Sequence, residues 1–500
     1  MREKAYLRQR YASILCSVGL VCLICGAATL SPLLTLLAWP GEAANAMAFV
    51  YPAAALCGLG GLLLTLRRHA ARDQLSVQEG GVIVCLSWLV VVLFSAWPFI
   101  ATEGLTFSQA VFESMSGWTT TGLSVVDVEK AARTTLLWRS VIQLLGGAGL
   151  AIIMMSAILG PAGVGVSSAE GRGDQLVPNV KRSARLVLIM YAGYAAAGTL
   201  AYRIAGMTWF DAVNHAFAAV STGGFSTRAA SIGYWDSPLI EAVTVPLMIL
   251  GNLSFVTAWF LWRGRMRTVV RNGEVRIFAL LVPIAATGVF FLTCVSLYPH
   301  LGKAFRVAVF ETVSALTTTG FSTVGYGNWN AFGMTVLIGL MLVGGGTCST
   351  AGGIKQFRVH ALWRALAFEI RRMAAPTNAV MDNSLWEGER RVFLDDGQVR
   401  QTAVFVFLYM ALFTLGVLLL CACGFSLENS LFEFASSLGT VGLSIGVTSP
   451  DMPGSALWAE TLAMFMGRLE FLVVVASLFK LGRDACNFLG GDGSRHGRSA

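Results

Sequence analysis

Four short blocks rich in threonine, serine and glycine recur along the chain, and their backbone oxygens are suited to binding a cation. Aligned on their final glycines, successive blocks lie between 96 and 122 residues apart. A repeat of this length is typical of a unit of several elements rather than of a solenoid. The four blocks are Thr119-Thr120-Thr121-Gly122, Ser221-Thr222-Gly223-Gly224, Thr317-Thr318-Thr319-Gly320 and Gly439-Thr440-Val441-Gly442.

Loops of this composition can form a ring of backbone carbonyl oxygens if they surround one axis. Such a ring replaces the hydration shell of a potassium ion, and Thr440-Val441-Gly442 has the pattern found at the core of a potassium filter. The blocks contain no carboxylate, so calcium-type selection is not expected. The alternative is that the glycines only allow helices to approach closely, but four copies at corresponding positions favour a cation site.

A short helix is expected before each block. Three copies carry an N-cap residue followed three positions later by a polar side chain: Thr106 and Gln109, Thr208 and Asp211, and Ser426 and Asn429. The third copy has Ala304 at the cap position, so its helix must begin differently. A helix over 107–118 is ~18 Å long, too short to cross a ~30 Å hydrocarbon core. We therefore predict half-membrane helices whose negative C-terminal ends favour cations.

The composition places these helices in a membrane. The chain has 500 residues, of which 55% are hydrophobic and 13% charged, whereas soluble domains are about 25% charged. No charged residue lies between Glu311 and Lys355. These values exclude soluble multidomain enzymes, collagen-like chains and disordered chains. They indicate a polytopic helical membrane protein.

We predict ten membrane spans and four half-helices. The fold class is an all-α polytopic membrane protein with four tandem membrane–pore-helix–membrane repeats around one central pore, preceded by two N-terminal transmembrane helices. The predicted spans are 11–38, 46–66, 79–102, 136–160, 183–205, 238–262, 277–298, 332–360, 401–424 and 455–480. The predicted domains are the N-terminal pair (1–72), repeat 1 (73–170), repeat 2 (171–272), repeat 3 (273–395) and repeat 4 with a cytoplasmic tail (396–500).

The net charge of +8 reflects membrane topology rather than nucleic-acid binding. Most basic residues lie in the links between apolar segments, where the positive-inside rule places them in the cytoplasm. The N-terminus, with Arg2 and Lys4, is expected on that side. Cys22 and Cys25 have no second Cys or His pair at ligand spacing, so neither a metal site nor a disulfide framework is expected.

A glycine-rich segment interrupts the predicted span 332–360. Ten small or polar residues with five glycines make a poor helix interior, so we expect a flexible break. A phosphate-binding loop is the alternative because Lys355 follows, but Ile354 stands between the last glycine and the lysine, which breaks the required spacing. The segment is Gly344-Gly345-Gly346-Thr347-Cys348-Ser349-Thr350-Ala351-Gly352-Gly353.

Arg468 lies inside the last predicted span. An intramembrane charge usually faces a pore or a partner. A contact with Glu470 is the structural alternative, but residues two apart do not face each other on a helix. We expect Arg468 to line the pore as an electrostatic barrier and Glu470 to pair elsewhere.

Three glutamates and a histidine occupy one corresponding position in the short helices. We expect Glu113, Glu311 and Glu433 to accept hydrogen bonds from the backbone behind the blocks rather than to bind ions directly. His215 takes this position in the second copy. It could sense protons, but a buried and hydrogen-bonded histidine is favoured.

On these blocks and their spacing, the chain resembles the Trk/Ktr/HKT superfamily of potassium transporters, most closely the bacterial TrkH type. The resemblance implies that the four blocks are the ion-binding filter, and that 344–353 is an intramembrane loop that obstructs the pore and moves during gating. It also implies a pore-facing arginine at Arg468. In relatives, glycine at the position of Gly122 accompanies potassium selectivity, whereas serine accompanies sodium conduction.

The resemblance further implies potassium uptake across the bacterial inner membrane, with potassium as the substrate and no bound cofactor. It implies a homodimer and a cytosolic nucleotide-binding regulatory subunit of the TrkA type, in contact with the basic loops. The first alternative is a sodium-permeable or cation-coupled symporter of the same superfamily. An intramembrane enzyme is least favoured because the sequence has no HExxH motif and no intramembrane aspartate pair. A non-conducting scaffold would leave the four blocks without a purpose.

Overall fold

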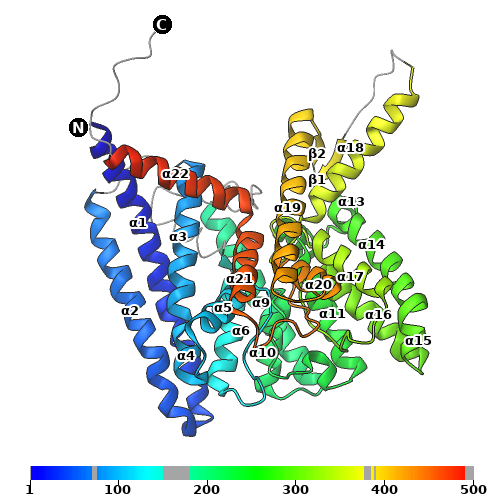
Figure 1. Ribbon diagram of the computed structural model, residues 1–500, viewed down its shortest axis with the longest axis horizontal. Coiled ribbons are helices and arrows are strands. Elements are labelled where there is room, and N and C mark those ends of the chain that lie inside the picture. Colours follow the sequence, from blue (N-terminus) through cyan, green and yellow to red (C-terminus); the bar gives the residue numbers. More distant parts are fainter. Residues whose placement is uncertain (1, 70–75, 150–179, 377–383, 388–389, 490–500) are drawn as a thin grey trace.

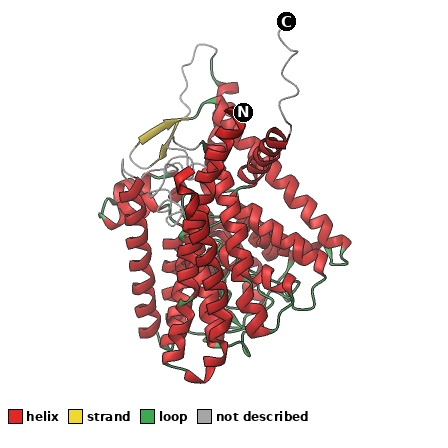
Figure 2. Cartoon of the chain, turned by 90° about the vertical axis from the view of Figure 1, so that its left-hand side faces the viewer, coloured by secondary structure: helices red, strands yellow, loops and turns green. Residues whose placement is uncertain are grey.

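The structure is a computed structural model that describes residues 2–69, 76–149, 180–376, 384–387 and 390–489. Within this part of the chain nearly every element is a helix (Figure 2). The exception is an antiparallel hairpin of β1 (Ser384–Glu387) and β2 (Arg390–Phe393). The end of the predicted span 136–160 and the predicted domain boundaries at 72 and 170 fall at or within segments outside the described residues.

Two N-terminal helices stand beside the first repeat (Figure 1). They are α1 (Arg2–Thr29) and α2 (Ala46–Leu64), joined and followed by the 3₁₀ turns η1 (Ser31–Leu37), η2 (Pro40–Asn45) and η3 (Thr65–His69). Arg10 of α1 forms a buried ion pair with Glu79 of α3. Glu79 also completes the capping box of Ser76 at the start of that helix. The N-terminal pair is thereby attached to repeat 1.

Each repeat contains a long first helix, a short helix, a loop and a second helix. Repeat 1 has α3 (Val77–Ser95), α4 (Trp97–Glu103), α5 (Phe107–Trp118) and α6 (Arg133–Gly147). Repeat 2 has α9 (Val180–Ile204), α10 (Trp209–Val220), η4 (Ser231–Tyr234), α11 (Pro238–Asn252), α12 (Phe255–Trp262) and α13 (Met266–Arg271). Repeat 3 has α14 (Gly273–Val289), η5 (Phe290–Cys294), α15 (Val295–Leu297), α16 (Leu301–Leu316), α17 (Ala331–Val343) and α18 (Gln356–Ala374). Repeat 4 has α19 (Asp396–Ala422), α20 (Leu427–Leu438), α21 (Gly454–Leu469) and α22 (Phe471–Leu489).

The short helices follow the predicted caps. Three of them have 12 residues, and each begins directly after its predicted N-cap residue: Thr106 for α5, Thr208 for α10 and Ser426 for α20. Thr106 and Gln109 form the predicted capping box. The third, α16, has 16 residues and starts at Leu301 without a side-chain cap. Since Ala304 has no side-chain oxygen that could cap the helix, the helix begins about one turn earlier.

The sequence predicts the break in repeat 3, but it does not predict the bends within the spans 238–262 and 455–480. Six described helices are long and apolar enough to cross a membrane, and up to eight spans result if each bent pair counts as one. The chain bends by 118° between α11 and α12 and by 97° between α21 and α22. In repeat 3, α17 stops after 13 residues at Gly344, which has a φ of +69°. Repeats 2, 3 and 4 thus break their second helix.

The described part of the link between repeats 3 and 4 has regular secondary structure. The helix α18 extends to Ala374 with an alternation of apolar and basic residues, and α19 begins at Asp396 with Asp395 as its N-cap. The charge of this segment belongs to a helix surface. Its hairpin lies at the same end of the molecule as the N-terminus (Figure 1).

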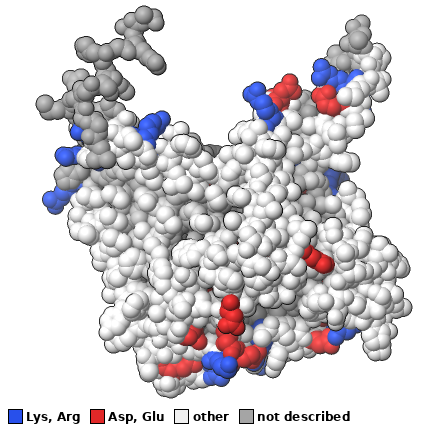
Figure 3. Space-filling view, in the orientation of Figure 1, with Lys and Arg blue, Asp and Glu red and all other residues white. Residues whose placement is uncertain are grey.

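The outer surface has a belt with few charges. On the face seen in Figure 3, the acidic and basic side chains gather toward two opposite ends, and the surface between them is nearly free of charge. Large apolar side chains of the described residues are also exposed, among them Leu280, Ile284 and Phe291. Such a belt is what a multi-pass membrane protein presents to lipid tails.

Candidate functional site

All four blocks adopt the same turn after their short helix. The second residue of each block is a threonine with a left-handed backbone: Thr120 (φ 55°), Thr222 (51°), Thr318 (54°) and Thr440 (52°). The amide of the next residue bonds back to the helix in every copy, as Thr121 N does to Ser116 O over 2.9 Å. A left-handed φ is unfavourable for a β-branched residue, and strained backbone of this kind clusters at functional sites.

The four blocks close into a ring. The final glycine of each block also has a positive φ, and it lies against the carbonyl of the third residue in the next block. A Cβ on any of these glycines would overlap that carbonyl, so only glycine fits. The glycine–carbonyl pairs are Gly122 with Gly223, Gly224 with Thr319, Gly320 with Val441, and Gly442 with Thr121. Because Gly442 of the fourth block contacts Thr121 of the first, the four blocks form a closed ring. The structure thus brings the sixteen block residues together.

Buried glutamates bond to the chain that leaves the ring, as predicted. Glu113 accepts from Val125 N (3.0 Å), and Glu433 accepts from Ile445 N (3.2 Å) and Thr448 N (3.0 Å). In repeat 3, Glu311 accepts from Thr323 N (2.8 Å) and from the hydroxyl of Tyr326. All three carboxylates are fully buried. Their hydrogen bonds fix the backbone just beyond each block.

Repeat 2 replaces this carboxylate with His215. Its Nε2 lies 2.9 Å from Ser226 Oγ, and its Nδ1 lies 2.8 Å from the carbonyl of Asp211. Asp211 itself accepts from Thr227 Oγ1 at 2.6 Å. His215 is fully buried and bonded through both nitrogens, which agrees with the favoured structural interpretation.

The sequence reasoning missed Arg139, which lies behind the ring between repeats 1 and 2. Its Nε donates to Glu113 Oε1 (2.8 Å) and its Nη1 to the carbonyl of Ser226 (3.0 Å). The guanidinium carbon also lies 3.9 Å from the centre of the Phe225 ring. A single buried arginine therefore joins two neighbouring blocks. Its position beside a stretch without charge, before Glu170, was a signal that could have identified it.

The sequence reasoning also missed Glu460, a fully buried residue of α21. The hydroxyl of Thr448 lies 2.5 Å from Glu433 Oε1 and 3.1 Å from Glu460 Oε2. The other oxygen of Glu460 has no hydrogen-bond partner among the described residues. Two buried carboxylates thus share one hydroxyl. A glutamate in the middle of an apolar helix was the available signal.

The segment 344–353 lies directly against the ring. Its Thr350 and Gly352 contact the left-handed threonines of all four blocks. The contacts are Thr222 Oγ1 to Thr350 Oγ1 (3.1 Å), Thr120 Oγ1 to Thr350 O (3.5 Å), Gly352 N to Thr318 Oγ1 (2.9 Å), and Gly352 against Thr440. The segment therefore packs against one side of the ring.

The same segment is anchored to the break in repeat 2. Gly346 N donates to Asn252 O (3.2 Å), and Thr350 N donates to Gly251 O (3.3 Å). Thr347 N donates to Glu274 Oε1 over 2.6 Å. The break after Asn252 exposes backbone carbonyls that a continuous helix would use internally, and the glycine-rich segment pairs with them.

Arg468 contacts the centre of this segment. Its guanidinium donates to Thr350 O and, over 3.0 Å, to Gly146 O at the end of α6. Glu470 does not face Arg468. It pairs with Arg358 of α18 at 2.7 Å. The expectation that Glu470 pairs elsewhere is confirmed. Arg468 thus contacts the segment itself, whereas Glu470 contacts α18, the helix after the segment.

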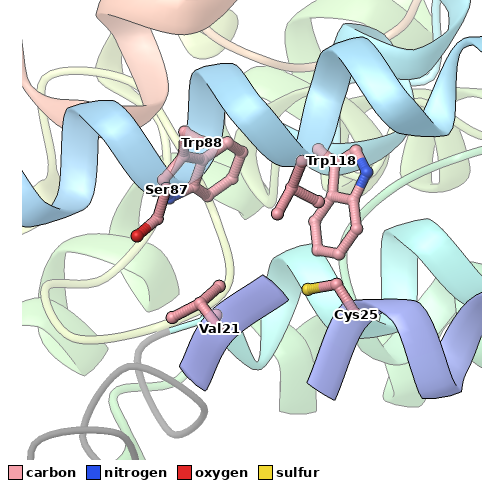
Figure 4. Close-up of a pocket in the computed structure, with 7 residues that line it drawn as sticks. Val21, Cys25, Ser87, Trp88 and Trp118 are labelled. Atoms are coloured by element: carbon pink, nitrogen blue, oxygen red, sulfur yellow. The ribbon is translucent and has the colours of Figure 1, made fainter. Parts of the chain in front are cut away.

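A separate apolar cavity of about 30 Å³ lies between α1, α3 and α5 (Figure 4). The rings of Trp88 and Trp118 lie edge to face across it, 6.2 Å apart, with Val21 and Cys25 opposite. It has room for about one water molecule and belongs to the packing of the N-terminal pair. Among the described residues no group of three or more His, Cys, Asp or Glu side chains is placed to hold a metal ion.

Comparison with known proteins agrees with this architecture. The family model TrkH, described as a cation transport protein, matches residues 46–486. The Trk system potassium uptake protein TrkH of Halomonas elongata is 33% identical over 446 residues, which cover 86% of this chain and 90% of that protein. The potassium uptake protein TrkG of Escherichia coli is 31% identical, with 84% of this chain and 88% of that protein covered.

The crystal structure of the potassium transporter TrkH from Vibrio parahaemolyticus has a TM-score of 0.81 with this structure at 28% sequence identity. The match covers 93% of this chain and 98% of that one. It confirms the predicted fold class. Because the relatives are named as transporters, this chain is a transporter rather than an enzyme. Since the family model and the relatives extend over most of the sequence, this chain belongs to the TrkH family of cation transport proteins.

Proposed function

We propose that this protein takes up potassium across the cytoplasmic membrane through the ring of four blocks. Its aligned relatives are named potassium uptake proteins. The ring supplies backbone oxygens, and the C-terminal ends of four short helices supply partial negative charge. Both favour a dehydrated monovalent cation, and neither supplies the carboxylates that a divalent ion prefers.

The observation that carries this proposal is the closure of the ring through four glycines. Each glycine allows a neighbouring carbonyl to approach to a distance that any side chain would prevent. The position and spacing of the carbonyl oxygens therefore depend on all four blocks together. In this proposal residues 119–122, 221–224, 317–320 and 439–442 are the potassium-binding filter.

We further propose that 344–353 and Arg468 form the gate. The segment contacts all four left-handed threonines, so an ion cannot leave the ring on this side until it moves. Arg468 holds Thr350 there and adds a positive charge on the ion path. Glycines at both ends of the segment allow it to change conformation at low cost.

Membership in the family supports three proposals about the assembly. The protein is a homodimer in a bacterial inner membrane, with the N-terminus and the basic links in the cytoplasm. A cytosolic nucleotide-binding subunit of the TrkA type contacts that end and controls the gate. The chain is divided at the predicted boundaries 1–72, 73–170, 171–272, 273–395 and 396–500.

The filter proposal is tested by potassium and sodium flux into proteoliposomes for the native protein and Gly122→Ser. The new side chain would overlap the Gly223 carbonyl and displace it. We expect selective potassium flux in the native protein and a loss of potassium-over-sodium preference of about tenfold, or ~1.4 kcal/mol, in the variant. Gly104→Ser is the control, because Gly104 has a positive φ but open space around it.

The same assay decides the second candidate, a sodium-permeable or sodium-coupled transporter. Equal potassium and sodium flux in the native protein, or potassium flux that requires sodium on the same side, would replace the potassium-selective proposal. A proton-coupled mechanism would show as acidification of the vesicle lumen during potassium entry.

The gate proposal is tested with Arg468→Ala. Removing the guanidinium frees the Thr350 carbonyl and takes a positive charge from the ion path. We expect potassium flux to increase several-fold without a change in selectivity. Unchanged or reduced flux in a correctly folded variant would contradict a barrier role for Arg468.

A further inference from the structure

A basic cleft lies at the end of the molecule that carries the N-terminus and the hairpin. Its volume is about 260 Å³, and its charged lining consists of Arg271, Arg276 and Arg364. They come from three elements, α13, α14 and α18, while Trp386 of β1 forms a further wall. None of the described residues that line the cleft is acidic. None of the lining residues belongs to the four blocks or to 344–353.

The guanidinium groups are positioned by contacts that leave donors available. Arg364 Nη2 donates to Ser384 O over 2.8 Å, while its buried Nε has no partner among the described residues. Among the described residues, the side chain of Arg276 makes one hydrogen bond, from Nε to Val270 O at 3.2 Å. Arg271 lies with its Cζ 5.5 Å from the centre of the Trp386 ring. Planar forks of this kind bind phosphate through paired N–H groups.

His360 shows the local excess of positive charge. It lines the cleft beside Gly273, the first residue of α14. Burial and the neighbouring groups of Arg364 and Arg276 lower the pKa of His360. A bound anion would offset this repulsion, and it would also face the positive end of α14.

The surface next to the cleft identifies the source of the anion. Arg276, Leu280 and Ile284 follow each other at intervals of four on α14, so they lie along one helix face. Leu280 is 59% exposed and Ile284 is 62% exposed. An apolar stripe thus continues along α14 from Arg276. A ligand with a phosphate at one end and acyl chains at the other matches both parts.

We propose that this cleft binds the phosphate of an anionic phospholipid from the cytoplasmic leaflet, with the acyl chains along Leu280 and Ile284. Basic pockets between membrane helices on this side recognise such head groups. Bound lipid would join α13 and α14 to α18, the helix that directly follows the glycine-rich segment. The lipid composition of the membrane would thereby influence the position of that segment.

The test uses the purified full-length protein with phosphatidylglycerol or phosphatidylethanolamine, and counts bound lipid by native mass spectrometry. We expect the native protein to retain phosphatidylglycerol preferentially. Arg276→Gln and Arg364→Gln should each weaken its binding about fivefold, and Arg276→Lys should weaken it less. Arg267→Gln is the matched control, since it removes the same charge from α13 outside the cleft.

Two results would overturn the proposal. The first is phosphatidylglycerol binding that the cleft variants leave unchanged while their thermal stability stays native. The second is displacement of the lipid by millimolar inorganic phosphate or ATP, which would assign the cleft to a soluble phosphate compound. A Leu280→Ser/Ile284→Ser variant separates the two sources, because it should reduce lipid binding and leave binding of soluble phosphate unaffected.

Discussion

Repeats 1 and 4 have the same backbone around the ring but different chemistry behind it. In both, a buried glutamate of the short helix accepts a hydrogen bond from the amide three residues past the final glycine. In repeat 1 that glutamate, Glu113, is neutralised by Arg139. In repeat 4 the corresponding Glu433 faces a second carboxylate, Glu460, through the hydroxyl of Thr448.

The difference shows that the ring requires a buried acceptor but not a particular counter-charge. Glu433 receives four donors, from Ser444, Ile445 and both the amide and hydroxyl of Thr448, and these stabilise its negative charge. A hydroxyl has one proton and gives it to one acceptor. The contact between Thr448 and Glu460 therefore needs a proton from Glu460. We expect Glu433 to be an anion and Glu460 a neutral acid.

The largest effect is expected from breaking the ion pair of repeat 1. Arg139→Met leaves Glu113 as a buried charge without a cation, which costs about 3–5 kcal/mol. Thermal unfolding in detergent should show a strong loss of stability, with loss of potassium flux. The double variant Glu113→Gln/Arg139→Met removes both charges and should recover a large part of the stability. A single variant as stable as the native protein would show that the pair does not support the ring.

A smaller effect is expected from Glu433→Gln in repeat 4. The amide offers one oxygen to four donors and turns its NH₂ group toward some of them. The loss of hydrogen bonds to a charged group amounts to about 1.5–3 kcal/mol. We expect lower thermal stability and weaker potassium-over-sodium selectivity, measured by flux in proteoliposomes.

The smallest effect is expected from Glu460→Gln, which makes the same chemical change one hydrogen bond away. The glutamine NH₂ can donate to Thr448 as a neutral acid does, so the change in stability should stay below about 0.5 kcal/mol. Flux should be unchanged from pH 6 to pH 8. If Glu460→Gln were as harmful as Glu433→Gln, Glu460 would carry a charge and the assignment of the two carboxylates would be wrong.

The local features of this fold were predictable because they depend on nearby residues. The caps at Thr106, Thr208 and Ser426 need partners only three positions away, so the short helices follow from the sequence. The backbone-bonding role of the glutamates also followed, because the same position recurs in three copies. The longer start of α16 was foreseeable only as the absence of a cap.

The features that were missed depend on contacts between distant segments. The bend after Asn252 is stabilised by the glycine-rich segment, almost one hundred residues further along the chain. Hydropathy alone predicts a straight helix there. Arg139 and Glu460 each look like isolated charges, and only the packing of neighbouring repeats gives them partners. The order in which the glycines close the ring likewise exists only in three dimensions.

That ring is made by one polypeptide, and this has a genetic consequence. In a pore built from four identical subunits, one codon change alters all four quarters at once. Here a codon change alters a single quarter and leaves the other three as they were. Each block can therefore diverge on its own, as Val441 and Gly223 already have, and new ion preferences can arise by steps that a symmetric pore could not take separately.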